Sequence, residues 1–168
     1  AVMRNTVVNM KRVMGNIDDI QARGNLMWDS AMAENGILKV GRVTDFQCHQ
    51  MEHQLGAYTD CNHGQGLAVI HPAYYRHIFR DGLDKFGRFA ANVWMIPREK
   101  KSREELAAAG LDALEAFIRE LGLPTSLRQL GVRDKKQLPV IAGSCHFSPG
   151  GYRKMMPEEI LEILQECF

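Results

Sequence analysis

The sequence predicts an all-α fold of about seven or eight helices. Strand signals are nearly absent, because no stretch sustains an alternation of apolar and polar residues and few runs rich in Val, Ile or Thr are bounded by turns. Apolar residues instead recur at helical spacing, and capping or breaking residues punctuate these segments. A length of 168 residues suits one domain, so we interpret residues 1–168 as a single helical domain.

The first two helices are expected before residue 36. Residues 2–14 form an amphipathic stretch that ends at Gly15. Asn16 is a suitable cap for a second helix, whose first turn is acidic and therefore suits the helix dipole. This second helix presents three apolar residues at spacings of seven and four and stops at residues 35–36; they are Ile20, Met27 and Ala31.

Three further helices are expected in the middle of the chain. One covers residues 44–56, and the next runs from near Gly64 to about Phe79. Pro72 lies inside the latter and should kink it, because proline lacks an amide donor. Residues 83–94 form another amphipathic segment.

Two further helices are expected after residue 101. Ser102 and Glu105 form a capping box that opens a helix closed by Gly122 and Pro124. Residues 143–153 are expected to form a loop, and Pro157 begins a final helix.

Composition excludes several classes of function. The net charge of +1 gives no electrostatic footprint for nucleic acid. No apolar run approaches the roughly 20 residues that a membrane-spanning helix needs, so we expect no membrane partner. The four cysteines lack CxxC spacing, which is typical of reduced thiols in a cytoplasmic protein.

The most informative segment contains three histidines and a glutamate. His49 and His53 are four residues apart and therefore share one helix face, with Glu52 beside them. His63 follows His49 by fourteen residues. Imidazole is the commonest metal-donating side chain and exchanges protons near pH 7, so this segment is the candidate for metal binding or proton transfer.

Local residues leave several interpretations open. H-x-x-E-H is a zinc peptidase signature, which would make His53 a ligand and would need a further ligand far downstream. A structural zinc site could instead recruit Cys48 and Cys61, although such sites usually show tighter paired spacing. The histidines could also be ordinary core or surface residues.

Longer segments around these histidines carry a family resemblance. In order, they are residues 25–31 (NLMWDSA), 35–36 (NG), 49–58 (HQMEHQLGAY), 63–68 (HGQGLA), 89–94 (FAANVW) and 121–127 (LGLPTSL). Together they resemble the iron-containing alcohol dehydrogenases, especially the butanol-dehydrogenase-like branch. The resemblance implies the helical metal-binding domain of an oxidoreductase that transfers hydride between a small alcohol or aldehyde and NAD(P).

The resemblance also implies a role for each candidate residue. His49 and His63 match the later two of the family's four ligands to a divalent metal, Fe²⁺ or Zn²⁺. His53 matches a histidine beside the substrate and the nicotinamide, where it would relay a proton as a catalytic residue. Glu52 would orient the helix or a ligand, the alternative being a surface carboxylate.

The chain departs from the family's pattern in its upstream part. It contains no glycine-rich phosphate loop and no D-x-x-x-H ligand pair before His49, so the N-terminal nucleotide-binding domain is absent from this chain. We expect a C-terminal domain that is inactive alone. Its exposed face should favour self-association or a homo-oligomer. A non-catalytic helical module with a degenerate metal site is the alternative.

Overall fold

The computed structural model describes all residues from 1 to 168 and contains helices without strands, which confirms the all-α prediction. The chain forms eight α-helices and four short 3-10 helices, which are η1 (Ile37–Lys39), η2 (Phe79–Gly82), η3 (Leu127–Leu130) and η4 (Lys135–Gln137). The chain divides into two compact units, residues 1–42 with 84–110 and residues 43–83 with 111–168. No helix is long and apolar enough to span a membrane.

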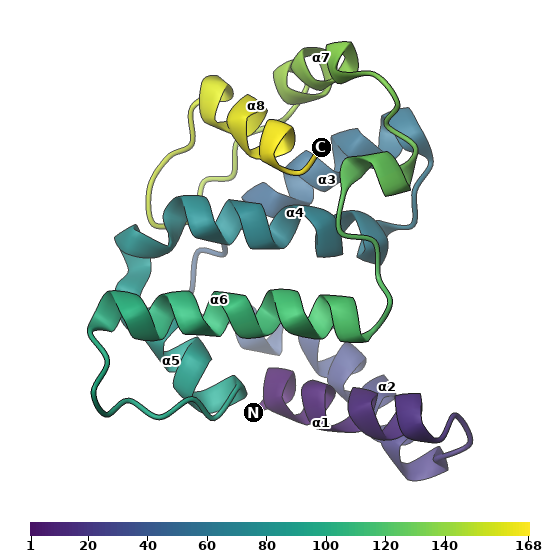
Figure 1. The fold of residues 1–168 in the computed structure, drawn as a ribbon, viewed down its shortest axis with the longest axis vertical. Helices are drawn as coiled ribbons and strands as arrows, with labels where there is room; N and C mark the ends of the chain where they lie inside the picture. Colours follow the sequence, from purple (N-terminus) through teal and green to yellow (C-terminus); the bar gives the residue numbers. More distant parts are fainter. The chain divides into compact units, whose positions relative to one another are not determined.

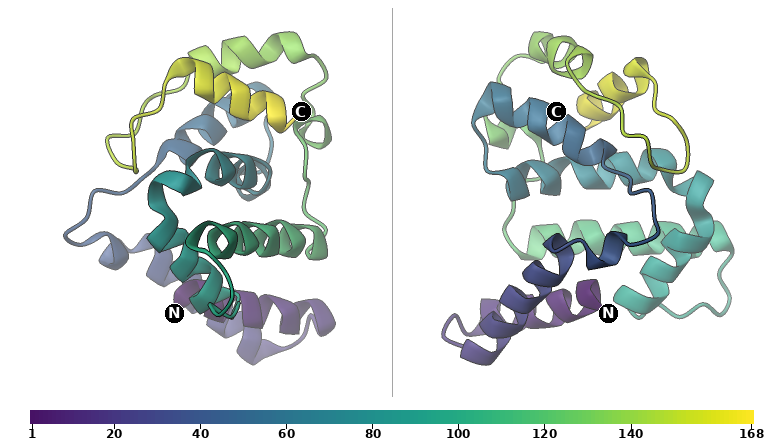
Figure 2. Two further views of the ribbon diagram at one scale, coloured as in Figure 1. Left: turned by 60° about the vertical axis from the view of Figure 1, so that its left-hand side comes forward. Right: turned by 180° about the vertical axis from the view of Figure 1, so that it is seen from behind.

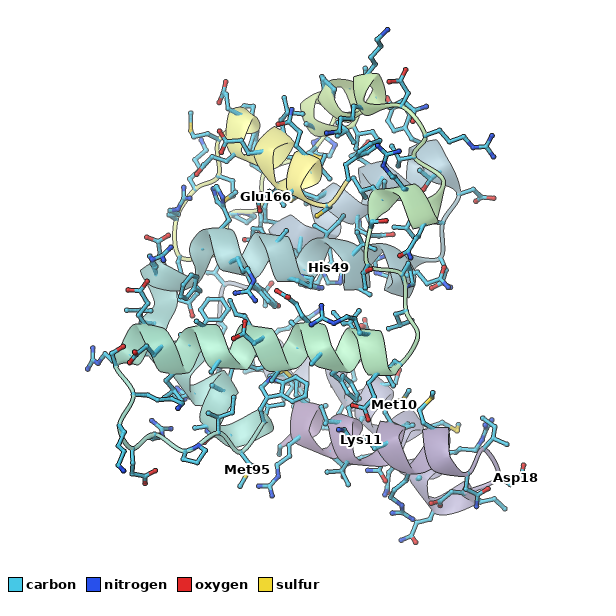
Figure 3. All side chains as sticks on the ribbon, in the orientation of Figure 1. Met10, Lys11, Asp18, His49, Met95 and Glu166 are labelled. Carbon is cyan, nitrogen blue, oxygen red and sulfur yellow. The ribbon has the colours of Figure 1, made fainter.

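In the first unit, α1 (Val2–Gly15) and α2 (Ile20–Glu34) lie side by side (Figures 1 and 2). The prediction that Asn16 caps α2 is wrong. The cap is Asp19, three residues later, whose carboxylate accepts the Ala22 amide at 2.9 Å. Asn16 is extended and its side chain accepts the Asp18 amide at 3.1 Å, so it shapes the turn before the helix. Asp18 marks this turn in Figure 3.

A cluster of polar side chains lies between α1 and α2, whose buried residues also include Val13 and Ala22. Asp29 is 5% exposed, and its carboxylate accepts hydrogen bonds from Asn5 Nδ2 at 3.0 Å and Thr6 Oγ1 at 2.9 Å. Asn25 Nδ2 donates to Asn9 Oδ1 at 3.1 Å. The apolar stripe that the sequence showed on α2 therefore faces outward, and its members are exposed: Ile20, Met27 and Ala31.

The first unit also contains most of α5 (Leu83–Val93) and the first half of α6 (Arg103–Glu120). These helices approach closely, since a Cβ at Gly110 would lie 2.8 Å from the Cβ of Ala90. The predicted capping box is present: Glu105 N donates to Ser102 Oγ at 3.2 Å, and Ser102 N donates to Glu105 Oε2 at 2.7 Å.

In the second unit, α3 (Gln47–Thr59) packs against α4 (His63–Ile78). The predicted range of α3, residues 44–56, is shifted by three residues. The Asp45 side chain accepts the Gln47 amide at 2.9 Å and sets the start, whereas left-handed Asp60 (φ 54°) sets the end. Helix α4 has the predicted extent and contains Pro72.

The remaining core of the second unit involves α7 (Leu138–Gly143) and α8 (Pro157–Glu166), which lie side by side in Figures 1 and 2. Helix α8 begins at Pro157 as predicted, whereas α7 is not among the predicted helices. Five fully buried side chains come from these two helices: Leu138, Ile141, Ile160, Ile163 and Leu164.

Candidate metal centre

Helices α3 and α4 bring the three predicted histidines together. His49 and His53 lie on α3, and His63 is the first residue of α4. The ring centroid of His63 lies 5.3 Å from that of His49 and 5.5 Å from that of His53, whereas His49 and His53 are 6.3 Å apart. His49 lies on α3 where this helix passes α4 (Figure 3). The three rings therefore lie close together, whereas the roles predicted for them stay predictions.

The start of α3 is held by side chains that carry no recognisable motif in the sequence. Tyr74 in α4 donates its hydroxyl proton to Asp45 Oδ2 at 2.7 Å. Gln47 donates to the His146 carbonyl at 3.1 Å and accepts the Ser148 amide at 2.9 Å. Asp45 is a residue type that often caps helices, so its bond to the Gln47 amide was predictable. The contacts with Tyr74, His146 and Ser148 were not, because these partners are far away in sequence. These bonds fix the helix end that carries His49.

The start of α4 is set by a local cap. Asn62 is extended, and its side chain accepts the Gln65 amide at 3.3 Å. Asparagine at this position satisfies one of the amide donors that a helix leaves unpaired at its beginning. The cap makes His63 the first residue of the helix and turns it toward α3.

Glu52 is buried beneath these histidines. Only 2% of the residue is exposed, and its carboxylate forms a hydrogen bond with Nδ1 of His63. The alternative that Glu52 is a surface carboxylate is therefore wrong. A buried carboxylate is costly unless it is paired, so the position indicates a defined interaction with His63.

The atoms that lie closest together form a plausible ligand group for a cation. One donor atom each from Glu52, His53 and His63 lies within 4.8 Å of the others. This group differs from the pair of His49 and His63 that the family resemblance implies, although the ring of His49 lies as near to His63 as that of His53 does. Imidazole nitrogen with one carboxylate is a donor set that suits Fe²⁺ and Zn²⁺.

Burial controls the protonation of two neighbouring side chains. It lowers the pKa of His71 to about 4, with a smaller contribution from His49, so His71 is neutral near pH 7. Burial also raises the pKa of Cys48 well above its usual value. No cysteine belongs to the group of donor atoms formed by Glu52, His53 and His63, so the geometry gives no support to a zinc site that uses Cys48.

Known proteins that resemble this chain belong to an alcohol dehydrogenase family. The sequence model of the "Fe-containing alcohol dehydrogenase family, C-terminal" matches residues 1–168. NADH-dependent butanol dehydrogenase A of Clostridium acetobutylicum is 35% identical over 173 residues, covering 100% of this chain and 44% of that protein. NADH-dependent butanol dehydrogenase B of the same organism is 37% identical over 149 residues, covering 88% of this chain and 38% of that protein.

The fold comparison agrees with the sequence comparison. The crystal structure of NADH-dependent butanol dehydrogenase A from Thermotoga maritima has a TM-score of 0.88 and 29% identity to this chain. The match covers 99% of this chain and 44% of that structure. This chain therefore spans less than half the length of these relatives.

Proposed function

This chain belongs to the Fe-containing alcohol dehydrogenase family as its C-terminal domain, and from that premise we propose that it forms the metal-binding and substrate side of an NAD(P)-dependent alcohol dehydrogenase. The observation that supports this proposal is the gathering of the rings of His49, His53 and His63 on α3 and α4. The substrate would be a small alcohol or the corresponding aldehyde, as the names of the butanol dehydrogenases suggest.

His49 and His63 would hold the divalent metal, Fe²⁺ or Zn²⁺, together with donors from the remainder of the whole protein. When bound, the metal polarises the oxygen of the alcohol or aldehyde. Two imidazoles alone hold a cation weakly, so the isolated chain is expected to be inactive. In the whole protein, NAD(P) would accept hydride from the alcohol, on a nucleotide-binding domain outside this chain.

His53 would move the proton that leaves the alcohol hydroxyl. Its side chain is exposed, unlike Glu52, and its ring lies 5.5 Å from that of His63. An exposed imidazole can accept a proton at the site and release it to solvent near pH 7. Hydride and proton together account for the two hydrogens lost when an alcohol becomes an aldehyde.

Single substitutions in the whole protein test these assignments. We expect His49→Ala and His63→Ala to remove most of the bound metal, and His53→Ala to retain it while lowering kcat by roughly 10²-fold or more. Metal analysis and NAD(P)-linked alcohol oxidation provide the readouts. His77→Ala is the matched control, because His77 lies on α4 but is paired with Glu159 at 3.0 Å.

Two results would contradict the proposal. Metal loss in His53→Ala as complete as in His49→Ala would make His53 a ligand, in the group with Glu52 and His63. A wild-type protein with neither metal nor NAD(P)-linked oxidation would instead be a non-catalytic helical module.

The exposed side of the α1–α2 pair suggests a contact with another protein surface. Large apolar side chains of these helices and their connecting turn are more than half exposed, including Ile17, Ile20, Met27 and Trp28. Exposed apolar clusters of this kind usually mark interaction sites. We therefore infer that the isolated chain self-associates through this side, which we call the α1–α2 apolar face.

A further inference from the structure

The hydrogen bond between Glu52 and His63 joins a buried side chain to an exposed one. The Glu52 side chain is 3% exposed, whereas that of His63 is 51% exposed. The carboxylate contacts Nδ1 of the ring. Because Nδ1 and Nε2 lie on opposite parts of an imidazole, a ring held through Nδ1 retains Nε2 for a second partner.

The close approach of α3 and α4 at this point requires a glycine. A Cβ at Gly66, one turn after His63, would lie 2.7 Å from both Cγ and Oε1 of Glu52. A Cβ at Gly56, on the same helix as Glu52, would lie 3.6 Å from Oε1, which is an ordinary contact. Gly66 therefore provides the space in which the carboxylate reaches the ring.

We propose that Glu52 is a positioning residue that holds His63 with its proton on Nδ1 and leaves the lone pair of Nε2 available to a divalent cation. A carboxylate accepts hydrogen bonds, so the nitrogen it contacts must carry the proton in the neutral ring. This arrangement is common behind metal-binding histidines, where it fixes the tautomer and increases the basicity of the ligating nitrogen. The inference rests on the cation site proposed above.

Direct coordination by Glu52 is the competing explanation. Its carboxylate belongs to the compact donor group with His53 and His63. However, Glu52 is buried and already bound to the ring of His63, whereas the two histidines are exposed. Burial beneath His63 and the existing bond favour a role through the imidazole.

The tautomer of His63 can be measured in this chain without any metal. Long-range ¹H–¹⁵N correlation spectra of ¹⁵N-histidine-labelled chain should show a protonated Nδ1 and an unprotonated Nε2. Glu52→Leu keeps a similar volume but removes the acceptor, so this preference should be lost. Glu52→Gln retains an acceptor oxygen and should restore much of it, which a purely structural role would not predict.

A titration with Zn²⁺ then tests the consequence for cation binding. In the wild-type chain, Zn²⁺ should shift Nε2 of His63 while Nδ1 remains protonated. Glu52→Leu should weaken Zn²⁺ binding by about 10- to 100-fold, the usual effect of removing such a partner. Glu52→Gln should weaken it less.

The two glycines provide a matched pair of variants. Gly66→Ala should displace the carboxylate, alter the His63 tautomer and weaken Zn²⁺ binding. Gly56→Ala adds the same methyl group near the same carboxylate without a clash, so the tautomer and Zn²⁺ affinity should be unchanged. Circular dichroism of each variant establishes whether the helices remain folded.

The outcomes separate this inference from the proposed function. An unchanged His63 tautomer in folded Glu52→Leu overturns the positioning role. Zn²⁺ attached to Nδ1, or displacement of the ring from Glu52 by Zn²⁺, also overturns it and makes direct coordination the better explanation. Retention of the metal by the whole protein in both His49→Ala and His63→Ala contradicts the proposed metal site itself, whatever the tautomer.

Discussion

Asp29 stabilises the first unit through part-buried hydrogen bonds with two partners. Asp29→Ala removes the acceptor of the Asn5 and Thr6 donors, and a hydrogen bond to a charged group contributes about 1.5–3 kcal/mol when it is well shielded. Asn5 is exposed and can bond to water instead, so we expect the free energy of unfolding to fall by about 1–3 kcal/mol in urea denaturation. Asp18→Ala, at an exposed position, should change it by less than about 0.5 kcal/mol. Equal effects of the two variants would show that the polar contact contributes nothing.

The predictability of individual residues depended on how far away their partners lie. His49 and His53 were predictable as neighbours, because four residues separate them on one helix. The burial of Glu52 was not, since it depends on α4 returning across α3. The same holds for Tyr74, whose hydroxyl reaches Asp45 from 29 residues away. The roles of His49, His53 and His63 in metal binding and proton transfer stay predictions.

Among the elements, α6 is stabilised at its start by a cap that the sequence predicted. Ser102→Ala removes the acceptor of the Glu105 amide and should lower the free energy of unfolding by about 1 kcal/mol. Thermal unfolding measures the effect. Lys101→Ala, at an exposed position before the cap, is the control. A loss in Lys101→Ala as large as in Ser102→Ala would contradict the role of the cap.

Helix α8 depends on an acidic residue in its first turn. Glu159 accepts the Met156 amide at 2.8 Å and pairs with Arg153 and His77. The hydrogen bond from Arg153 is the main cause that lowers the pKa of Glu159 to about 2. The lowered pKa means that the folded state binds this proton less readily than the unfolded state, so the stabilisation is present above about pH 4.5 and lost toward pH 2.

Glu159→Gln tests this pH dependence. The variant should be less stable than the wild type at pH 6, and the difference should shrink as the pH falls from 4.5 toward 2. Unfolding free energies measured across this range provide the check. Glu158→Gln, in the same turn of α8 and exposed, is the matched control. A difference that stays constant with pH would exclude the carboxylate as its source.

Elements were predictable where their signals were local. The capping box of α6 and the proline at the start of α8 are encoded within a few residues, and both helix starts were confirmed. The six-residue helix α7 is too short to show helical periodicity, and its burial depends on packing against α8. The outward orientation of the apolar stripe on α2 was not predictable either, because the polar partners of the opposite side of α2 lie on α1.

At the scale of the whole molecule, the first unit exposes large apolar side chains on α1 and α2 while it buries polar side chains between these two helices. Asn9 and Asp29 are buried between α1 and α2, whereas Met27 and Trp28 are 75% and 66% exposed. An isolated helix pair in water would normally have the opposite arrangement. The all-α class was predictable from periodicity, but this inversion required knowledge of which side of each helix faces its partner.

The α1–α2 apolar face should make the isolated chain self-associate at high concentration. Burial of a large apolar side chain contributes about 1.5–3 kcal/mol, so Met27→Lys should weaken association by roughly tenfold or more. Sedimentation velocity over a concentration series measures the shift from larger species to monomer. Val140→Lys is the matched control, because Val140 is 56% exposed but lies on α7 in the second unit. A chain that remains monomeric at all concentrations, or an equal effect of both lysines, would contradict a contact through this face.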